Sequence, residues 1–505
     1  MTNPLFDALF APHANSTATL LIDPDGFETS YRDFLNTAAR IANTLAEAGL
    51  QPGDRLAMQV AKSPAALATY VACVQAGVVL LPLNTAYTAT EVDYFVGDAE
   101  PKMLLCDPAQ EASLKPVADT RNARLMTLDG TGAGSFADAY ANQPDRFETR
   151  DRGPDDLAAF LYTSGTTGRS KGAMLTQNNL LSNAQALVET WRFTENDILL
   201  HALPIFHTHG LFVASNVTFL AGGSMIFLPG FNTDQMIAFL PKATTMMGVP
   251  TFYTRLLQDG RLTRDLVSHI RLFVSGSAPL LAETHTEFEN RTGHRILERY
   301  GMTETSMITS NPYDKDRKPG AVGSALPGIE IRVADPETGK VLPGGEIGVV
   351  EVRGPNVFQG YWRMPEKTAE EFRADGFFIT GDLGFIDEGG YLTLVGRGKD
   401  LIISGGYNIY PKELELLLDE SDGVLESAVI GVPHPDFGEG VVGVLVPMPD
   451  GEIDEAAILA EIKPKVAKFK QPKVLFTIDS LPRNTMGKVQ KNILREKYKN
   501  TFKAS

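Results

Sequence analysis

The 505-residue sequence is poor in cysteine, with Cys73 and Cys106 as its two thiols. They form no CxxC pair, and two thiols cannot build the disulfide framework of a small secreted domain. This composition fits a reducing compartment, and we therefore expect the protein to lie in the cytoplasm.

The sequence also lacks the marks of export and of a membrane span. Its first residues carry no basic start ahead of an apolar stretch, so no secretory signal of the usual kind is expected. The stretch that comes nearest to a span opens with Ser63 and Pro64 and is interrupted by Gly77. Ser and Pro are typical of a helix start and Gly of a helix end, so we predict a buried helix followed by a strand at 78–81. No membrane partner is expected.

Positive charge is scarce outside the C-terminal segment. The formal net charge is −16, yet residues 461–505 hold twelve Lys or Arg against three Asp or Glu. Nucleic acid is not an expected partner, because no recognition motif accompanies these basic residues and the acidic remainder would repel a phosphate backbone. Two interpretations remain for the basic segment: a solvated face of a small domain, or a face that meets a small phosphorylated ligand.

The rest of the composition is that of an ordinary globular protein, with 43% hydrophobic and 21% charged residues. A chain of this length divides into at least two domains. From about residue 28 to 300, amphipathic helical stretches alternate with short apolar runs, which predicts an α/β fold of βα units on largely parallel sheets. The expected strands include residues 55–60, 78–83, 102–106, 224–228 and 271–277.

The pattern changes after residue 320. Between about 320 and 400, short strands and Gly-rich turns predict a β-barrel-like subdomain. Beyond it, two strands in ESAVIGVPH and GVVGVLVPM and a helix in AAILAEIKPKVA predict a compact α+β segment. We therefore expect a large N-terminal domain over residues 1–399, a small mobile C-terminal domain over residues 400–505, and a hinge near Asp400.

Residues 162–172, YTSGTTGRSKG, combine small hydroxyl residues, glycines and one lysine after an apolar run. Successive backbone N–H groups and hydroxyls in such a loop can surround phosphate oxygens, while Lys171 supplies a positive charge. The spacing does not match the Walker A loop GxxxxGK[ST]. The composition indicates a phosphate-binding loop, with an ordinary surface turn as the alternative.

Four further motifs follow this loop. They are ERYGMTE (298–304), FITGDLG (378–384), GRGKDLIISGGYNIYP (396–411) and PRNTMGKVQK (482–491). The five motifs in this order resemble those of the adenylate-forming superfamily, which includes acyl-CoA synthetases, adenylation domains of peptide synthetases and firefly-type luciferases. The resemblance covers most of the chain from residue 162 onward. It implies that ATP and a carboxylate form an acyl-adenylate, whose acyl group then passes to coenzyme A.

The motifs also have a chemical interpretation of their own. The flat ring of Tyr300 suits adenine, the Thr303 hydroxyl suits the α-phosphate, and Glu304 offers a hard oxygen ligand for Mg²⁺. Asp382 can accept both ribose hydroxyls. A buried tyrosine, a helix-capping threonine and a turn aspartate are the alternatives. Together with the resemblance, these motifs predict a nucleotide site of Thr163, Ser164, Gly165, Thr166, Thr167, Gly168, Lys171, Gly276, Ala278, Tyr300, Thr303, Asp382 and Arg397, with Thr163 and Glu304 as ligands of Mg²⁺.

The resemblance gives the C-terminal segment a part in both steps. It implies that Lys488 bridges the substrate carboxylate and the α-phosphate. Acylation of Lys488 would remove its charge, so a lysine acyltransferase or deacylase is an expected partner. The expected catalytic residues are Lys488, Glu304, Thr303 and His207. The residues expected to meet coenzyme A after rotation about Asp400 are Lys399, Gly405, Gly406 and Tyr407.

Polar residues occur in the segments that line the acyl site of the superfamily. The expected acyl-site residues are Arg299, His207, Ser277 and Met302. Arg299, His207 and Ser277 could hold the second carboxylate of a small dicarboxylate. The segments PIFHTHGL and ERYGMTE most resemble those of malonyl-CoA synthetases, which makes malonate the expected substrate and methylmalonate a second candidate. A structural role for Arg299 and a packing role for the two histidines of PIFHTHGL are the alternatives.

Other functions remain open at this point. A CoA ligase for short- or medium-chain monocarboxylates needs the same motifs, as does an adenylation domain that loads a carrier protein. A non-catalytic nucleotide-binding scaffold is a third alternative. The presence of Lys171, Glu304, Asp382, Arg397 and Lys488 together argues against a scaffold.

Overall fold

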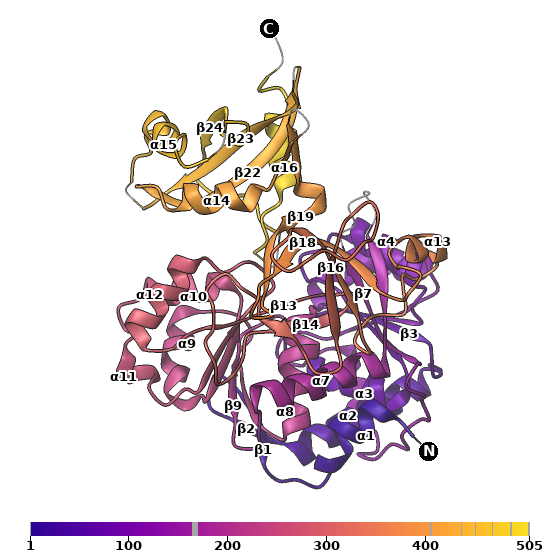
Figure 1. Ribbon diagram of the computed structural model, residues 1–505. Helices are drawn as coiled ribbons and strands as arrows, with labels where there is room; N and C mark the ends of the chain where they lie inside the picture. Colours follow the sequence, from indigo (N-terminus) through magenta and orange to yellow (C-terminus); the bar gives the residue numbers. More distant parts are fainter. Residues whose placement is uncertain are drawn as a thin grey trace. The chain divides into compact units, whose positions relative to one another are not determined.

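A computed structural model describes residues 2–163, 170–404, 407–435, 437–449, 451–466, 468–484 and 487–502. The chain forms two compact units (Figure 1). The first comprises residues 1–319, 323–330 and 352–378, and the second comprises residues 320–322, 331–351 and 379–505. The predicted α/β class is confirmed, whereas the domain boundary at Asp400 stays a prediction.

Two mixed sheets form the framework of the first unit. One has the order β6-β5-β3-β4-β7-β8, with parallel pairs up to β7 and an antiparallel pair between β7 and β8. The other has the order β15-β14-β13-β12-β11-β9-β10-β1-β2, parallel in its interior and antiparallel at both edges. The strands are β1 (Thr19–Ile22), β2 (Glu28–Ser30), β3 (Arg55–Gln59), β4 (Val79–Pro82), β5 (Met103–Cys106), β6 (Arg124–Thr127), β7 (Leu157–Thr163), β8 (Lys171–Thr176), β9 (Ile198–His201), β10 (Ser224–Phe227), β11 (Thr245–Gly248), β12 (Leu272–Ser275), β13 (Leu297–Met302), β14 (Ser306–Ser310) and β15 (Ser324–Ala325).

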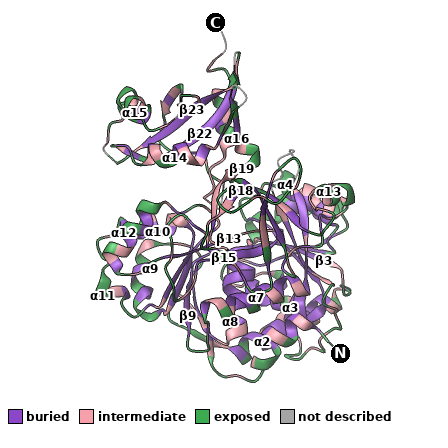
Figure 2. Ribbon diagram, viewed as in Figure 1, coloured by how far each residue is buried: buried purple, intermediate pink, exposed green. Residues whose placement is uncertain are grey.

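Helices cover these sheets, and the interior strands are largely buried, as Figure 2 shows in purple. Every residue of β4 and β5 is buried, as expected of parallel strands covered on both faces. The α-helices of the first unit are α1 (Pro4–Leu9), α2 (Tyr31–Glu47), α3 (Pro64–Ala76), α4 (Ala89–Ala99), α5 (Glu111–Thr120), α6 (Ser135–Ala141), α7 (Gln177–Trp191), α8 (Asn216–Ala221), α9 (Thr233–Phe239), α10 (Pro250–Leu257), α11 (Arg264–Val267), α12 (Ala282–Thr292) and α13 (Pro365–Glu370). A π-helix, η3, spans His209–Ser215.

Helix α3 confirms the helix predicted from its flanking residues. The Ser63 side chain accepts a hydrogen bond from the backbone N–H of Ala66, and Gly77 ends the helix in the left-handed region at φ 71°. Strand β4 follows within three residues. No helix among the described residues is both long enough and apolar enough to cross a membrane.

The region predicted to be barrel-like contains a four-stranded sheet of order β16-β17-β18-β19. Its strands are β16 (Glu330–Ala334), β17 (Gly348–Arg353), β18 (Phe378–Ile386) and β19 (Leu392–Arg397). Short strands joined by Gly-rich turns therefore occur where the sequence predicted them.

The C-terminal part of the second unit is α+β, as expected. Its sheet comprises β20 (Ile402–Ser404), β21 (Tyr407–Ile409), β22 (Val424–His434), β23 (Gly438–Pro447) and β24 (Val474–Thr477), and its helices are α14 (Pro411–Asp419), α15 (Glu455–Ile462) and α16 (Lys491–Tyr498). The helix predicted in AAILAEIKPKVA was wrong in its second half, because α15 ends at Ile462. Lys463 still has helical backbone angles, φ −46° and ψ −47°, but Pro464 has no N–H with which to continue the helix.

Candidate active site

The predicted phosphate loop joins two paired strands. Thr163 at the end of β7 lies opposite Lys171 at the start of β8, and the Thr163 hydroxyl lies 3.5 Å from the Lys171 carbonyl oxygen. The predicted nucleotide ligands Ser164, Gly165, Thr166, Thr167 and Gly168 lie outside the described residues. The described geometry therefore fixes the two ends of the loop.

Lys171 belongs to a buried network of alternating charge. Its ammonium group donates to Glu371 Oε1 at 3.0 Å and lies 3.9 Å from the centre of the Tyr361 ring. The Tyr361 hydroxyl lies 3.0 Å from Glu304 Oε1 and 3.1 Å from Glu371 Oε2. Burial and the two carboxylates raise the pKa of Tyr361, so the phenol keeps its proton and can donate to either carboxylate. Lys171 and Glu304 thus both contact the Tyr361 side chain.

Strands β13 and β14 form a hairpin whose turn carries Thr303 and Glu304. Thr303 therefore caps no helix, which removes the structural alternative considered for it. Tyr300 is buried in β13 and pairs with Thr309 across the hairpin. A side chain at Gly301 would place Cβ 2.0 Å from the Ser306 carbonyl oxygen, so the hairpin needs glycine next to the predicted adenine-stacking tyrosine.

Glu304 has the chemistry of a Mg²⁺ ligand. Among the described residues, no group of three or more His, Cys, Asp or Glu could hold a metal ion. Mg²⁺ is commonly held by one or two carboxylates together with water and substrate phosphates, so the Glu304 carboxylate, with Glu371 on the same Tyr361 hydroxyl, suits this ion. Thr163 stays a predicted second ligand.

Arg299 lies in β13 beside Gly276, which follows β12. The Arg299 side chain is 3% exposed, and its Nε and Nη2 have no hydrogen-bond partner among the described residues. A Cβ at Gly276 would lie 2.4 Å from Arg299 Cζ, so this glycine makes room for the guanidinium. Burial lowers the pKa of Arg299 to about 9, which shows how poorly its charge is compensated.

Ser277 follows the glycine that packs against Arg299, and His209 lies near enough to Arg299 and His207 to be affected by their charges. Ser277 Oγ lies 3.2 Å from His209 Nδ1, and the Nε2 atoms of His207 and His209 are buried and have no hydrogen-bond partner within the described ranges. Burial lowers the pKa of His207 to about 4, and burial with the Arg299 charge lowers that of His209 further below its usual value. Ser277 adopts φ 73°, a strained backbone conformation that is often found at functional sites. His209 thus links Arg299, His207 and Ser277 in one buried region, and their contact with a second carboxylate stays a prediction.

The second unit contains a separate cluster of predicted residues. Asp382 in β18 lies opposite Arg397 in β19, and Arg397 Nε lies 2.9 Å from Asp382 Oδ1. Burial and the nearby Arg397 charge lower the pKa of Lys488 to about 8, and Asp382 opposes this shift. Lys488 therefore lies close enough to Asp382 and Arg397 for their charges to affect its pKa.

The predicted hinge and CoA residues also lie in this unit. Asp400 accepts a hydrogen bond from Arg495 at 2.7 Å, directly after the exposed Lys399. Tyr407 is 57% exposed and stacks on Phe469 at a ring distance of 4.5 Å. Gly405 and Gly406 lie outside the described residues.

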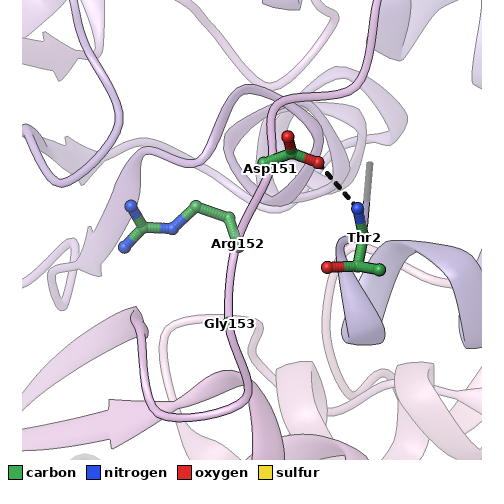
Figure 3. Close-up of a pocket in the computed structure, with 4 residues that line it drawn as sticks. All are labelled: Thr2, Asp151, Arg152 and Gly153. Carbon is green, nitrogen blue, oxygen red and sulfur yellow. Dashed lines mark hydrogen bonds between the residues drawn. The ribbon is translucent and has the colours of Figure 1, made fainter.

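One cavity of the first unit lies away from the predicted residues (Figure 3). Its volume is about 400 Å³, and it is lined by Thr2, Asp151, Arg152 and Gly153. The Thr2 backbone N–H donates to Asp151 Oδ1 at 2.7 Å, which ties residue 2 to this surface. None of its lining residues has a predicted role.

Family models match both parts of the chain. The model for AMP-binding enzymes matches residues 10–362, and the model for the C-terminal domain of AMP-binding enzymes matches residues 413–488. The chain belongs to the AMP-binding enzyme family. These ranges contain Lys171, Arg299 and Glu304 in the first match and Lys488 at the end of the second.

Solved and curated relatives of this AMP-binding enzyme span nearly its full length. ATP-bound MatB from Rhodopseudomonas palustris is 59% identical, with a TM-score of 0.98 and full coverage of both chains. A malonate–CoA ligase of Arabidopsis thaliana is 32% identical over 98% of this chain and 89% of its own. A feruloyl-CoA synthase of an Amycolatopsis species is 36% identical over 98% of both chains. The family is thus clear, while the names of these relatives refer to different acids, malonate and ferulate.

Sequence reasoning missed Tyr361 and Glu371. They lie about 200 residues beyond the phosphate loop and outside the five motifs, so nothing local marks them as neighbours of Lys171. The segment GYWRMPEKTAEEF has an aromatic pair followed by an acidic stretch. This pattern is common on protein surfaces and does not by itself indicate a functional site.

Proposed function

We propose that the protein is an AMP-forming synthetase that ligates malonate to coenzyme A. The observation that carries this proposal is the buried guanidinium of Arg299, which has unpartnered Nε and Nη2 atoms beside Ser277 and the two histidines. A buried charge is costly unless it is paired. A ligand carboxylate supplies that pair, so the pocket suits an acid with a second carboxylate.

The preference for a dicarboxylate follows from this pairing. A charge-assisted contact is worth about 1.5–3 kcal/mol net, which corresponds to roughly ten- to a hundredfold in selectivity. A monocarboxylate of similar size leaves Arg299 unpaired and therefore binds less well. Methylmalonate keeps both carboxylates and is the second candidate substrate.

In the first half-reaction, a malonate oxygen attacks the α-phosphorus of ATP, and the bond to pyrophosphate breaks to give malonyl-AMP. We assign Tyr300 to adenine, Asp382 and Arg397 to the ribose, and Lys171 to the phosphates. Lys488 neutralises charge between the attacking carboxylate and the α-phosphate. A unit charge about 4 Å from an anion is worth roughly 4 kcal/mol at an effective dielectric of 20.

Mg²⁺ is the proposed cofactor, held by Glu304 with Thr163. When bound, it would neutralise phosphate charge. Tyr361 supports this assignment, because its hydroxyl contacts Glu304 and can orient the carboxylate.

In the second half-reaction, the thiol of coenzyme A attacks the malonyl carbonyl carbon, and the bond to AMP breaks. We propose that residues after Asp400 rotate between the two steps and that Tyr407, with Lys399, Gly405 and Gly406, meets the CoA arm. The exposed ring of Tyr407 supports this role, since an exposed aromatic is free to contact a ligand.

Both thiols of the chain are free and buried, which supports a cytoplasmic location.

The proposal is tested by product analysis with ATP, Mg²⁺ and CoA in the presence of malonate, methylmalonate, butyrate or ferulate. We expect malonyl-CoA, AMP and pyrophosphate in equal amounts, and a kcat/KM for malonate at least about tenfold above that for butyrate. Formation of ADP would contradict the adenylate chemistry. Highest turnover of ferulate or butyrate would keep the ligase and reject malonate as its substrate.

A further inference from the structure

The segment that carries His209 is a π-helix, η3, of seven residues. Such helices are rare, usually single turns, and frequent at functional sites. In η3, a Cβ at Gly210 would lie 2.0 Å from the Pro204 carbonyl oxygen, so the segment packs against residue 204 without room for a side chain. The position of η3 therefore depends on its contacts with the rest of the fold.

Lys62 and His201 supply those contacts. Lys62 follows β3, and its Nζ lies 2.9 Å from His201 Nδ1 and 2.7 Å from the His201 carbonyl oxygen. The same amino group lies 4.2 Å from the centre of the Phe227 ring. His201 ends β9 and is 1% exposed, and its Nε2 lies 3.0 Å from the Gly210 carbonyl oxygen in η3.

The direction of these hydrogen bonds is fixed by the Gly210 carbonyl oxygen, which can only accept and so requires a proton on His201 Nε2. The Lys62 amino group has an N–H for each of its two acceptors, the His201 carbonyl oxygen and Nδ1. With Nδ1 as an acceptor, neutral His201 carries its proton on Nε2 and donates it to Gly210. Burial and the neighbouring Lys62 lower the pKa of His201, which keeps the ring neutral. A donor on Lys62 therefore stabilises the tautomer that anchors η3.

The anchored helix leads directly to the acyl pocket. His209 is its first residue, and its Nδ1 lies 3.2 Å from Ser277 Oγ. Arg299 and His207 are close enough to lower the pKa of His209. A shift of η3 would therefore move His209 relative to Ser277 and Arg299, the groups assigned to the second carboxylate.

We propose that Lys62 and His201 are positioning residues that hold η3 where the acyl pocket selects a dicarboxylate. This inference rests on the proposed function, because it concerns the selectivity of the same pocket. The proposal gives Lys62 and His201 a part in substrate specificity, although no contact with malonate or ATP is assigned to either residue. Their loss lowers selectivity for malonate and leaves the nucleotide site unchanged.

The test compares kcat/KM for malonate with kcat/KM for butyrate in Lys62→Met and His201→Leu. The ratio of the two constants does not depend on the fraction of folded enzyme. We expect it to fall about tenfold in both variants, with KM for ATP within about twofold of the wild-type value. His201→Gln keeps a donor that can reach Gly210 and should retain most of the selectivity.

Lys242→Met is the matched control, because Lys242 also lies over a phenylalanine ring, that of Phe239, and is exposed.

An unchanged ratio in Lys62→Met or His201→Leu would overturn the proposal, as would a parallel rise in the KM values for malonate and ATP. Failure of the proposed function is seen separately, since the wild-type enzyme would then show no preference for malonate before any variant is compared.

Discussion

Two cations, the buried Arg299 and the half-buried Lys488, have central parts in the proposed chemistry. Arg299 and Lys488 are each held where burial disfavours their charged forms, which lowers the pKa of Lys488 to about 8. A lysine that is partly neutral near physiological pH is a better nucleophile than an ordinary surface lysine. We therefore expect Lys488 to react with acylating reagents at a lower pH than an ordinary lysine, in addition to its proposed role as a catalytic cation.

Lys488 should be acetylated with an unusual pH dependence. We expect its rate of labelling by limiting acetic anhydride to rise with a midpoint near pH 8, because the ammonium loses its proton there. Adenylate formation should fall over the same range, since the step needs the charged form. Mass spectrometry of Lys488 gives the midpoint, and a peptide of residues 482–491 is the reference, with an expected midpoint of about 10.4. Equal midpoints for protein and peptide would contradict the account.

At this scale, the sequence named candidate residues but not all of their partners. Arg299, His207 and Ser277 were grouped from the motifs, and the structure brings them together. Tyr361 and Glu371 could not be found, because their contacts with Glu304 and Lys171 arise only when distant segments of the chain pack together.

At the scale of elements, helix α7 fixes the strand that carries Lys171. Thr176 ends β8 and caps α7, where the Thr176 and Asn179 side chains exchange hydrogen bonds with each other's backbone N–H. Asn179 Nδ2 also donates to the carbonyl oxygens of Pro355 and Val357, both at 2.8 Å. One side chain thus joins a helix start to a distant loop.

Asn179→Ala should lower the free energy of unfolding of the first unit by about 3 kcal/mol, as three hydrogen bonds worth about 1 kcal/mol each are lost. Urea unfolding followed by tryptophan fluorescence measures this, because Trp191 and Trp362 both lie in that unit. Asn178→Ala alters the neighbouring, less buried asparagine and should cost under about 0.5 kcal/mol. Equal effects of the two substitutions would exclude the proposed role of Asn179.

Elements were predictable where local signals agree with packing. Helix α3 has a Ser-Pro start and a Gly end, and both signals were read correctly. The π-helix η3 was not predictable, because its geometry depends on contacts with Pro204 and His201 rather than on its own sequence. Helix α15 was predicted too long because the apolar pattern was given more weight than Pro464.

At the scale of the whole molecule, the proposed residues divide between two compact units. Arg299, Tyr300 and Glu304 lie in the first, and Asp382 and Lys488 lie in the second. The order of the five motifs predicted that all serve one reaction, but a sequence cannot show how a chain rearranges between two steps. The hinge at Asp400 is therefore a matter for experiment.

Asp400→Pro should separate the half-reactions. Proline fixes φ near −65° and restricts rotation at the proposed hinge, so we expect thioester formation to fall at least about tenfold more than the release of pyrophosphate in a single turnover. Asp400→Ala is the control, because it removes the contact with Arg495 and leaves the backbone free to rotate. If the two variants lose both half-reactions equally, the hinge does not lie at Asp400.

The most direct test of the central claim is the ratio of kcat/KM for malonate to kcat/KM for butyrate, measured in the wild type and in Arg299→Met. Arg295→Met serves as the control, since Arg295 is exposed and pairs with Glu289 on the surface. We predict a wild-type ratio of at least about ten that falls to about one in Arg299→Met and is unchanged in Arg295→Met. An unchanged ratio in Arg299→Met would contradict the claim that Arg299 selects malonate. A wild-type enzyme that prefers butyrate would contradict the assignment of the protein as a malonate–CoA ligase.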